Sequence, residues 1–268
     1  MKTFFKVLGI IILIIVIFLV TMFISGYLYL NSKLSQMQQV EIDENNLNVA
    51  EEVEQQLSGY RNIAIYGVDS RDSDLGKGNR SDCIIIASIN NDTKEINLVS
   101  VYRDTYVDID GYGLDKITHA YSYGGPELAL KTLNENLDLN VKEFVTVSFD
   151  AVADAVNAIG GVEIDVEENE IEYLNNYARA TAKNIGTTVE TVTKSGVQTL
   201  DGIQAVAYAR IRYTEGGDYK RTERMRTVIE AMFEKLKTKS IGEINELADQ
   251  ILPEVYTNID SNEVISLA

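Results

Sequence analysis

The sequence predicts an α/β fold with a central mixed β-sheet flanked by helices, arranged as an α-β-α sandwich. Short apolar strands alternate with helical segments along most of the chain, which is the pattern of layered α/β proteins. The run at residues 83–89 is apolar on both faces, as expected of a strand covered on both sides. The 268 residues allow one sizeable domain with accessory segments, and Ile, Val, Leu and Tyr are plentiful enough for its core.

The N-terminal residues form a strongly apolar segment that stands apart from this pattern. Residues 7–24 are almost unbroken in their apolar character, and residues 27–30 extend them past the roughly 20 residues that a membrane span requires. A cleaved signal peptide is the competing interpretation, but it would have a shorter apolar region and an Ala-x-Ala-like site. Lys2 and Lys6 precede the run, so the positive-inside rule predicts a cytoplasmic N-terminus over 1–6 and a single transmembrane helix over 7–30. The rest of the chain is then expected outside the cell, held at the cell membrane.

Beyond the predicted span, the chain divides into an acidic linker and a globular domain. Residues 31–59 are polar and acidic with loosely helical spacing, which predicts an extracellular stalk. The domain is expected over 60–268. Its first three strands are predicted at 62–68, 83–89 and 96–102, and residues 106–109 either extend the third strand or pair with a segment beyond Gly111.

The second half of the domain alternates between helices and strands. Pro126 predicts the first turn of a helix that runs to about residue 137, because proline is favoured there. A strand at 144–149 precedes a helix capped by Asp150, and a further strand follows at 162–166. An excursion with a helix comes next, and the C-terminal part is expected to hold helices at 221–237, capped by Asp218, and at 241–251.

An arginine-rich stretch near the C-terminal end is the most unusual feature of the domain. Its first residues alternate as in a strand, so Tyr208, Arg210 and Arg212 are predicted to share one strand face. A glycine pair then breaks the chain, and Arg221 and Arg224 recur three apart on one face of the following helix. The formal net charge of the chain is −17, so this concentration of guanidinium groups favours an anionic ligand, which Arg binds in a planar, bidentate way. The alternative is a solvated face paired with nearby acidic residues.

Composition and missing motifs exclude several classes of function. The acidic charge argues against a nucleic-acid partner, which would require a basic surface. Cys83 is the only cysteine, so neither an internal disulfide nor a Cys-based zinc site can form. The only histidine, His119, cannot build a His-ligated metal centre by itself and is expected to hydrogen-bond within its loop rather than act as a general base. P-loop and Gly-x-Ser-x-Gly motifs are absent.

Polar residues collect at the ends of the predicted strands. Asp69 closes the first strand, Asp82 opens the second, and Arg103 and Asp104 close the third. Ligands of open α/β sheets gather at strand ends, and an antiparallel hairpin would bring Asp69 close to Asp82. Two carboxylates without an imidazole suit Mg²⁺, and surrounding arginines, Arg80 among them, suit a multiply charged oxyanion. Taken singly, each of these residues is also compatible with a salt bridge in a loop.

An ordered set of motifs resembles a known family. The set consists of NRSD at 79–82, SVYRDT at 100–105, KITHAYSYGG at 116–125, IGGV at 159–162, LDG at 200–202, YARIR at 208–212 and DYKRTER at 218–224. Together they resemble the LytR–CpsA–Psr family of cell-envelope phosphotransferases, over roughly residues 62–233.

The resemblance implies an activity, a cofactor and a set of partners. In that family a glycopolymer such as wall teichoic acid or capsule, carried on a polyprenyl pyrophosphate, is moved to a hydroxyl of peptidoglycan, and polyprenyl phosphate leaves. The resemblance implies Mg²⁺ held by Asp69 and Asp82, with lipid-linked glycopolymer, peptidoglycan and membrane lipid as partners. The polar residues it implies are a catalytic group of Arg80, Asp82, Arg103 and Asp104 and a substrate-binding group of Arg80, Arg103, Lys116, Arg210, Arg212, Arg221 and Arg224. The family's lipid pocket would be lined from segments such as 128–137, 152–159 and 225–233, unless these faces are ordinary core.

The chain departs from the family's pattern only at uncharged positions. Met225 stands where a Gln often follows the helix arginine, Cys83 replaces a common Thr, and Tyr102 replaces a common Pro. Two other functions stay open, a non-catalytic receptor for polyprenyl phosphates and hydrolysis of the pyrophosphate by water. The presence of both Asp69 and Asp82 favours an enzyme, because an anion receptor needs arginines but no metal.

Overall fold

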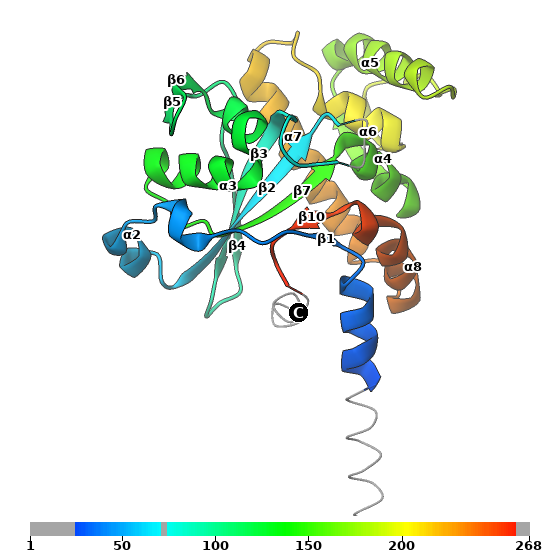
Figure 1. Ribbon diagram of the computed structural model, residues 1–268. Coiled ribbons are helices and arrows are strands. Elements are labelled where there is room, and N and C mark those ends of the chain that lie inside the picture. The colour runs from blue at the N-terminus through cyan, green and yellow to red at the C-terminus, as the bar shows by residue number, and fades with distance from the viewer. Residues whose placement is uncertain (1–24, 71–73, 261–268) are drawn as a thin grey trace, which may run out of the picture.

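A computed structural model of the chain describes residues 25–70 and 74–260 and is centred on a six-stranded mixed β-sheet (Figure 1). The strand order is β1-β10-β7-β2-β3-β4. The four longer strands are β2 (Tyr60–Val68), β3 (Ser81–Asn90), β4 (Ile96–Ser100) and β7 (Glu143–Ser148). The short strands β1 (Gln38–Gln39) and β10 (Tyr256–Thr257) form the edge beyond β7.

The two central strands, β2 and β3, form the antiparallel hairpin that the sequence predicts. Their register pairs Tyr60 with Asn90 at one end and Val68 with Ser81 at the other. β7 runs parallel to β2, with Val68 opposite Ser148. The end of β2, the start of β3 and the end of β7 therefore lie together at one end of the sheet, where polar ligands are expected to bind.

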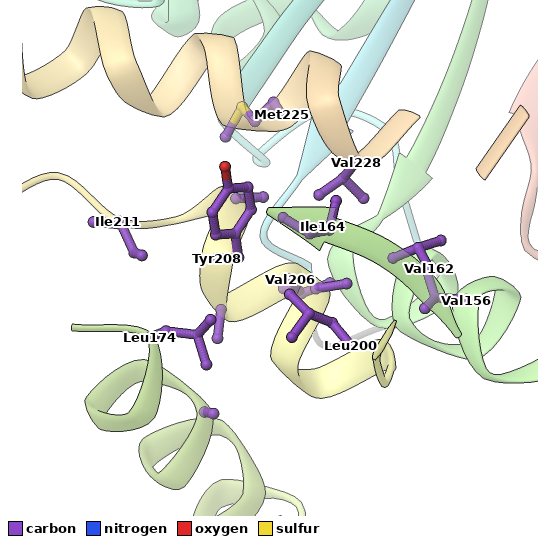
Figure 2. Close-up of a cluster of buried hydrophobic side chains, with 14 of the residues drawn as sticks. Val156, Val162, Ile164, Leu174, Leu200, Val206, Tyr208, Ile211, Met225 and Val228 are labelled. Atoms are coloured by element: carbon purple, nitrogen blue, oxygen red, sulfur yellow. The ribbon is translucent and has the colours of Figure 1, made fainter. Parts of the chain in front are cut away.

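Helices cover both faces of the sheet, which confirms the expected α-β-α arrangement. One face packs against α3 (Ile117–Leu137) and the short 3-10 helix η1 (Glu44–Leu47). The opposite face belongs to a second core cluster that includes residues of α4 (Phe149–Ala158), α6 (Gly202–Ala209) and α7 (Gly217–Leu236), part of which is drawn in Figure 2. β3 supplies Ile84 and Ile86 to the first cluster and Cys83 and Ile85 to the second, as its alternation requires.

The remaining elements lie around this sandwich. The hairpin predicted beyond Gly111 is present as β5 (Tyr106–Ile109) and β6 (Gly113–Lys116). The strand predicted at 162–166 is β8 (Val162–Val166), which pairs with β9 (Gly196–Leu200) outside the central sheet. The excursion between β8 and β9 contains η2 (Glu168–Glu170) and α5 (Ile171–Asn184), and the C-terminal part contains α8 (Ile241–Ile251) and η3 (Leu252–Glu254).

The N-cap residues of two helices differ from the prediction, whereas Pro126 begins a helical run as expected. Pro126 does begin a helical run, after a break in α3 at Gly125, whose φ of 70° suits glycine. Asp150 is not the cap of α4, because Ser148 takes that place and accepts a hydrogen bond from the backbone N–H of Ala151. Asp218 likewise lies inside the first turn of α7 rather than capping it.

The predicted strand through Tyr208, Arg210 and Arg212 is wrong. Tyr208 lies in α6, Arg210 is the residue that ends this helix, and Arg212 lies in the loop that follows. The helix begins with a reciprocal capping box in which Asp201 and Gln204 each bind the other's backbone N–H. An alternation of five residues is too short to identify a strand, because the last turn of a buried helix followed by an extended loop can show the same pattern.

The prediction of a free stalk over 31–59 is also wrong for much of that segment. β1 pairs with β10 in the sheet, and η1 places Leu47, which is fully buried, in the core beside α3. The helix α2 (Glu51–Gln56) follows and leads into β2. The acidic side chains of this segment are mostly exposed, which is typical of a linker. The few apolar residues that attach the segment to the domain were therefore not recognised from composition.

The predicted transmembrane helix lies mostly outside the described residues. Residues 25–34 are helical and lead away from the sheet at the end opposite the exit of β2 (Figure 1). Within the described part of the chain, no helix is both long and apolar enough to cross a membrane.

Candidate anion-binding site

Charged residues from five separate segments meet where β2 ends and β3 begins. Asp69 follows β2, Asp82 is the second residue of β3, and Arg103 follows β4. The loop after α6 adds Arg210 and Arg212, and the first turns of α7 add Arg221. The structure therefore brings these side chains together, although Arg210 comes from a helix end and Arg212 from a loop rather than from a strand.

Asp82 is the centre of an ion-pair network. It is only 16% exposed, accepts a hydrogen bond from Nη1 of Arg103, and lies 3.8 Å from Nη2 of Arg212. Asp69 is more exposed and lies 3.3 Å from Nη2 of Arg210. The guanidinium of Arg210 also lies 5.5 Å from the centre of the Phe149 ring, which helps to orient it. Each carboxylate thus positions one or two arginines at this end of the sheet.

Arg221 is the most unusual residue of the site. Its side chain is almost fully buried, and Nη2 pairs with Asp218 at 2.7 Å. Its Nε and Nη1 are buried and have no partner among the described residues. Burial lowers the pKa of this guanidinium. Asp218 opposes the shift, and the nearby charges of Arg212 and Arg103 add to it. A buried cation with free donors is costly unless an anion completes it.

A small cavity lies directly beside these donors. Its volume is about 140 Å³, and it is lined by Asp82, Phe149, Tyr177, Arg210, Arg212, Arg221 and Met225. At roughly 30 Å³ per water molecule, this is room for a few water-sized groups or for two linked phosphoryl groups. Three guanidinium groups around so small a space define a pocket for a compact, multiply charged oxyanion.

Asp104 and Lys116 extend the network on one side. Nζ of Lys116 lies 2.9 Å from Oδ1 of Asp104, which also lies 3.7 Å from Nε of Arg103. Burial opposes ionisation of Asp104, but the hydrogen bond from Lys116 and the charges of Arg103 and Arg221 lower its pKa overall. Arg80 is exposed and forms no ion pair within the described residues, so it is free to reach a ligand at the mouth.

Arg224 lies apart from this group. It is buried and pairs with the equally buried Glu170, with 2.7 Å between Nε and Oε1. Its other nitrogens donate to the backbone oxygen of Ile211 and to the hydroxyl of Thr214. One nitrogen of Arg224 thus binds Glu170, and the other two bind the loop that carries Arg212. Arg224 therefore supports the loop of the site rather than facing the cavity.

The two carboxylates where β2 ends and β3 begins, Asp69 and Asp82, suit a magnesium ion that is shared with a phosphate ligand. Mg²⁺ is commonly held by one or two carboxylates together with substrate phosphates and water, and Asp69 and Asp82 provide two carboxylates. Across residues 25–70 and 74–260, no group of three or more His, Cys, Asp or Glu side chains is placed to hold a metal by itself. These two carboxylates can therefore hold Mg²⁺ only with oxygen atoms from elsewhere.

The single histidine and cysteine both have structural roles. Nδ1 of His119 lies 2.9 Å from Oδ2 of Asp115, as expected of a residue that hydrogen-bonds locally. Cys83 is buried, and burial raises the pKa of its thiol to about 12. It is thus a packing residue at neutral pH.

The site also contains residues that the sequence did not single out. Asp218 was expected as a helix cap or as a surface partner of the arginines, and it is the partner of the buried Arg221. Their spacing of three in a helix was the available signal. Tyr177 and Phe149 reach the cavity from α5 and α4, which no local pattern indicates.

The three segments proposed to line one lipid pocket do not lie together. Residues 128–137 pack on one face of the sheet, whereas 152–159 and 225–233 belong to the cluster on the other face. A single pocket therefore cannot be lined by all three.

A larger cleft elsewhere in the described structure has the wrong chemistry for an anion. Its volume is about 560 Å³, and it lies between the end of α4 and the β8–β9 hairpin. Lys194 is the only cation in its lining, and Asp201 and Gln204 there already cap α6.

The fold and this site define an α/β protein with a buried arginine pocket whose charge and size suit a phosphate-containing ligand. The chain belongs to the LytR_cpsA_psr family, whose family model matches residues 24–268. The relationship inferred from the ordered motifs is therefore confirmed.

Individual relatives show the same relationship. Polyisoprenyl-teichoic acid–peptidoglycan teichoic acid transferase TagU of Enterococcus faecalis is 33% identical over 209 residues, which are 77% of this chain and 64% of the relative. A solved structure of TagT bound to LI-WTA is 29% identical, with a TM-score of 0.62 and coverage of 85% of this chain and 76% of the other. A structure of the same family with bound octaprenyl pyrophosphate lipid is 31% identical, with a TM-score of 0.54 and coverage of 72% and 73%.

The chain is shorter than these curated relatives. It spans 64% of the Enterococcus faecalis protein and 61% of a TagU from Oceanobacillus iheyensis.

Proposed function

We propose that this chain is a cell-envelope phosphotransferase that moves a glycopolymer from a polyprenyl-pyrophosphate carrier to peptidoglycan. The observation that carries the proposal is Arg221, a buried arginine with two unpartnered nitrogens beside a cavity of about 140 Å³. Relatives described as teichoic acid transferases, and a related structure with bound octaprenyl pyrophosphate, support a pyrophosphate as the ligand. A wall teichoic acid is the polymer that these relatives favour.

The reaction transfers one phosphoryl group. A hydroxyl oxygen of the acceptor attacks the phosphorus that bears the glycan, and the bond from this phosphorus to the bridging oxygen breaks. Polyprenyl phosphate leaves with the bridging oxygen, the proton of the acceptor hydroxyl passes to water, and a phosphodiester joins glycan and peptidoglycan. In such reactions catalysis consists mainly of positioning and charge stabilisation.

The arginines perform this work. The cavity is lined by Arg210, Arg212 and Arg221, and Arg103 is paired with Asp82, which also lines it. These guanidinium groups would stabilise negative charge on the bridging and terminal oxygens of the pyrophosphate.

Three further charged residues act at the edge of the pocket. Arg80 and Lys116, both exposed, would contact the glycan side of the ligand. Asp104 is better suited to hold Arg103 and Lys116 than to accept a proton, because its lowered pKa makes it a weak base.

Asp69 and Asp82 would hold Mg²⁺ when the pyrophosphate is present. The ion would supply charge neutralisation at the phosphate oxygens. Without it, the same carboxylates keep Arg103, Arg210 and Arg212 oriented.

The same proposal includes a membrane anchor. The apolar run at 7–30 would hold the chain in the cell membrane with the N-terminus inside and the domain outside, where its lipid-linked donor and peptidoglycan are found. Protease added to intact protoplasts is expected to remove the domain, and full protection would contradict this topology.

The product of a defined reaction tests the activity. The full-length chain in detergent is incubated with a polyprenyl-pyrophosphate-linked glycan, peptidoglycan fragments and Mg²⁺, and products are identified by mass spectrometry. We expect glycan phosphate on peptidoglycan, and a loss of about a hundredfold or more in rate for Asp82→Asn. Glu215→Ala is the control, since Glu215 is exposed in the turn before α7 and lines no part of the cavity.

Three outcomes separate the alternatives. Free glycan phosphate without transfer would identify a pyrophosphatase. Tight binding of the donor without any turnover would identify a receptor, in which both carboxylates serve only to hold arginines. Equal turnover with and without a metal chelator would remove Mg²⁺ from the mechanism.

A further inference from the structure

Two exposed tyrosines contact each other, and each lies within two residues of an arginine of the site in the sequence. The ring centres of Tyr102 and Tyr219 lie 4.4 Å apart at an angle of 63°, an edge-to-face arrangement. Tyr102 directly precedes Arg103, and Tyr219 stands two residues before Arg221. Tyr102 is 37% exposed and Tyr219 is 67% exposed, so both side chains keep surface that a ligand can reach.

Both rings are attached to ordered backbone. The carbonyl of Tyr102 accepts hydrogen bonds from the backbone N–H and the hydroxyl of Thr105, at 2.9 and 2.6 Å. Tyr219 belongs to the first turn of α7, the helix that also carries Arg221. The pair is therefore pre-organised, and ligand binding would not have to order it. Neither phenol hydroxyl forms a hydrogen bond with another described residue.

The size of the pocket determines what must lie outside it. A volume of about 140 Å³ admits the two phosphoryl groups but not a sugar ring in addition. A sugar bonded to the phosphate, or an acceptor sugar whose hydroxyl approaches it, must therefore rest at the rim. An open aromatic ring offers such a sugar a flat surface for its apolar C–H face, and a free phenol hydroxyl offers a hydrogen bond.

We propose that Tyr102 and Tyr219 form a stacking platform for a pyranose ring held next to the pyrophosphate. This inference rests on the proposed function and adds a carbohydrate subsite to it. The membrane surface is the less favoured partner for these rings, because the site lies at the end of the sheet opposite the helical segment 25–34 (Figure 1) and the chain is strongly acidic.

Paired ligands that differ only in the sugar test the platform. Farnesyl pyrophosphate and farnesyl pyrophosphoryl-N-acetylglucosamine are titrated into the full-length chain in detergent by calorimetry. A soluble β-1,4-linked N-acetylglucosamine tetramer, added after farnesyl pyrophosphate, probes the acceptor side. Tyr102→Leu and Tyr219→Leu remove each ring, Tyr102→Phe keeps it, and Tyr60→Leu is the matched control, an exposed tyrosine at the opposite end of β2.

We expect the two leucine variants to lose roughly three- to tenfold in affinity for a sugar-bearing probe, with affinity for farnesyl pyrophosphate unchanged. Tyr102→Phe should keep most of the affinity, and Tyr60→Leu all of it. A loss confined to the sugar-linked lipid assigns the platform to the donor, and a loss confined to the tetramer assigns it to the acceptor.

Other results overturn the inference. Equal losses on the sugar-bearing and sugar-free lipids would show that the tyrosines merely support the arginines or contact lipid. Unchanged binding of every probe in both leucine variants would show that the rings bind no sugar. A parent chain that binds no farnesyl pyrophosphate at all would contradict the proposed function itself, whereas a parent that binds it but gains nothing from either sugar contradicts only the platform.

Discussion

Arg221 and Arg224 show how two buried arginines one turn apart can have opposite roles. Both are almost inaccessible to solvent, yet Arg224 is fully paired with Glu170, Ile211 and Thr214, while Arg221 keeps two nitrogens without a partner among the described residues. A satisfied buried ion pair supports the fold, and its disruption leaves a buried charge. An unsatisfied buried donor weakens the fold unless a ligand completes it.

The same substitution at the two positions is therefore expected to separate stability from binding. Arg224→Met should lower the free energy of unfolding by about 3–5 kcal/mol, because it leaves the carboxylate of Glu170 buried and unpaired. Arg221→Met should leave stability unchanged or raise it, but weaken pyrophosphate binding roughly ten- to a hundredfold. Urea unfolding followed by circular dichroism, and calorimetry with farnesyl pyrophosphate, measure the two quantities.

A control distinguishes lost pairing from lost packing at Arg224. The double variant Glu170→Gln/Arg224→Met removes both charges and should recover much of the lost stability. Arg224→Met with parental stability would contradict the structural role. Such a result would return Arg224 to the ligand-binding group that the sequence predicts.

Spacing in the sequence could predict which arginines lie on one helix face but not which of them faces a ligand. Arg224 points to Glu170, which lies 54 residues earlier in the chain, and no local pattern indicates that contact. Asp69, Asp82 and Arg103 were easier to predict, because the ends of neighbouring strands meet at one edge of the sheet.

Two elements were predicted with the correct bounds, whereas the prediction failed where a helix cap decided the outcome. The strand at 162–166 and the helix at 241–251 have the expected bounds. The prediction for the arginine stretch failed because Asp201 and Gln204 start a helix that continues to Ala209, so Tyr208 is helical and Arg210 ends the helix. Local alternation is a weak signal when a capping box lies just upstream.

The start of α3 provides a prediction about pH. Oδ2 of Asp115 lies 2.7 Å from the hydroxyl of Tyr123 and 2.9 Å from Nδ1 of His119, and Oδ1 accepts from the backbone N–H of Lys116. The hydrogen bond from Tyr123, followed by those from His119 and Lys116, lowers the pKa of Asp115 to about 2. Since this folded-state pKa lies below the ordinary value of about 3.9, the carboxylate stabilises the fold fully above that value. The contribution is lost as the pH falls towards 2.

Asp115→Asn should therefore reduce stability at about pH 5 and flatten the dependence of Tm on pH between about 2 and 4. Thermal unfolding of parent and variant across this range measures the effect. Asp92→Asn is the control, because it makes the same change of charge in the exposed turn after β3. If both variants follow the same curve, the hydrogen bonds around Asp115 do not contribute to stability.

At the scale of the whole molecule, the N-terminal segment closes the sheet. β1 pairs Gln38 with Tyr256 and Gln39 with Thr257, so residues far apart in the chain form one edge together. The sequence could not predict this, because two-residue strands leave no periodic pattern and the acidic residues around them are typical of a linker. The compact part of the chain thus begins well before Tyr60.

Leu47 tests this extension of the domain. It is fully buried in the cluster beneath α3, and its carbonyl accepts a hydrogen bond from Nδ2 of Asn134 at 3.1 Å. Leu47→Ala should lower the free energy of unfolding by about 2–5 kcal/mol, because it removes buried methyl groups and leaves a cavity. Leu114→Ala makes the same change at a position that is 64% exposed and should cost less than about 0.5 kcal/mol. Urea unfolding of the two variants measures the difference. Equal, small effects would mean that residues 31–59 are a stalk after all. A large effect at Leu47 alone places the start of the folding unit before β2.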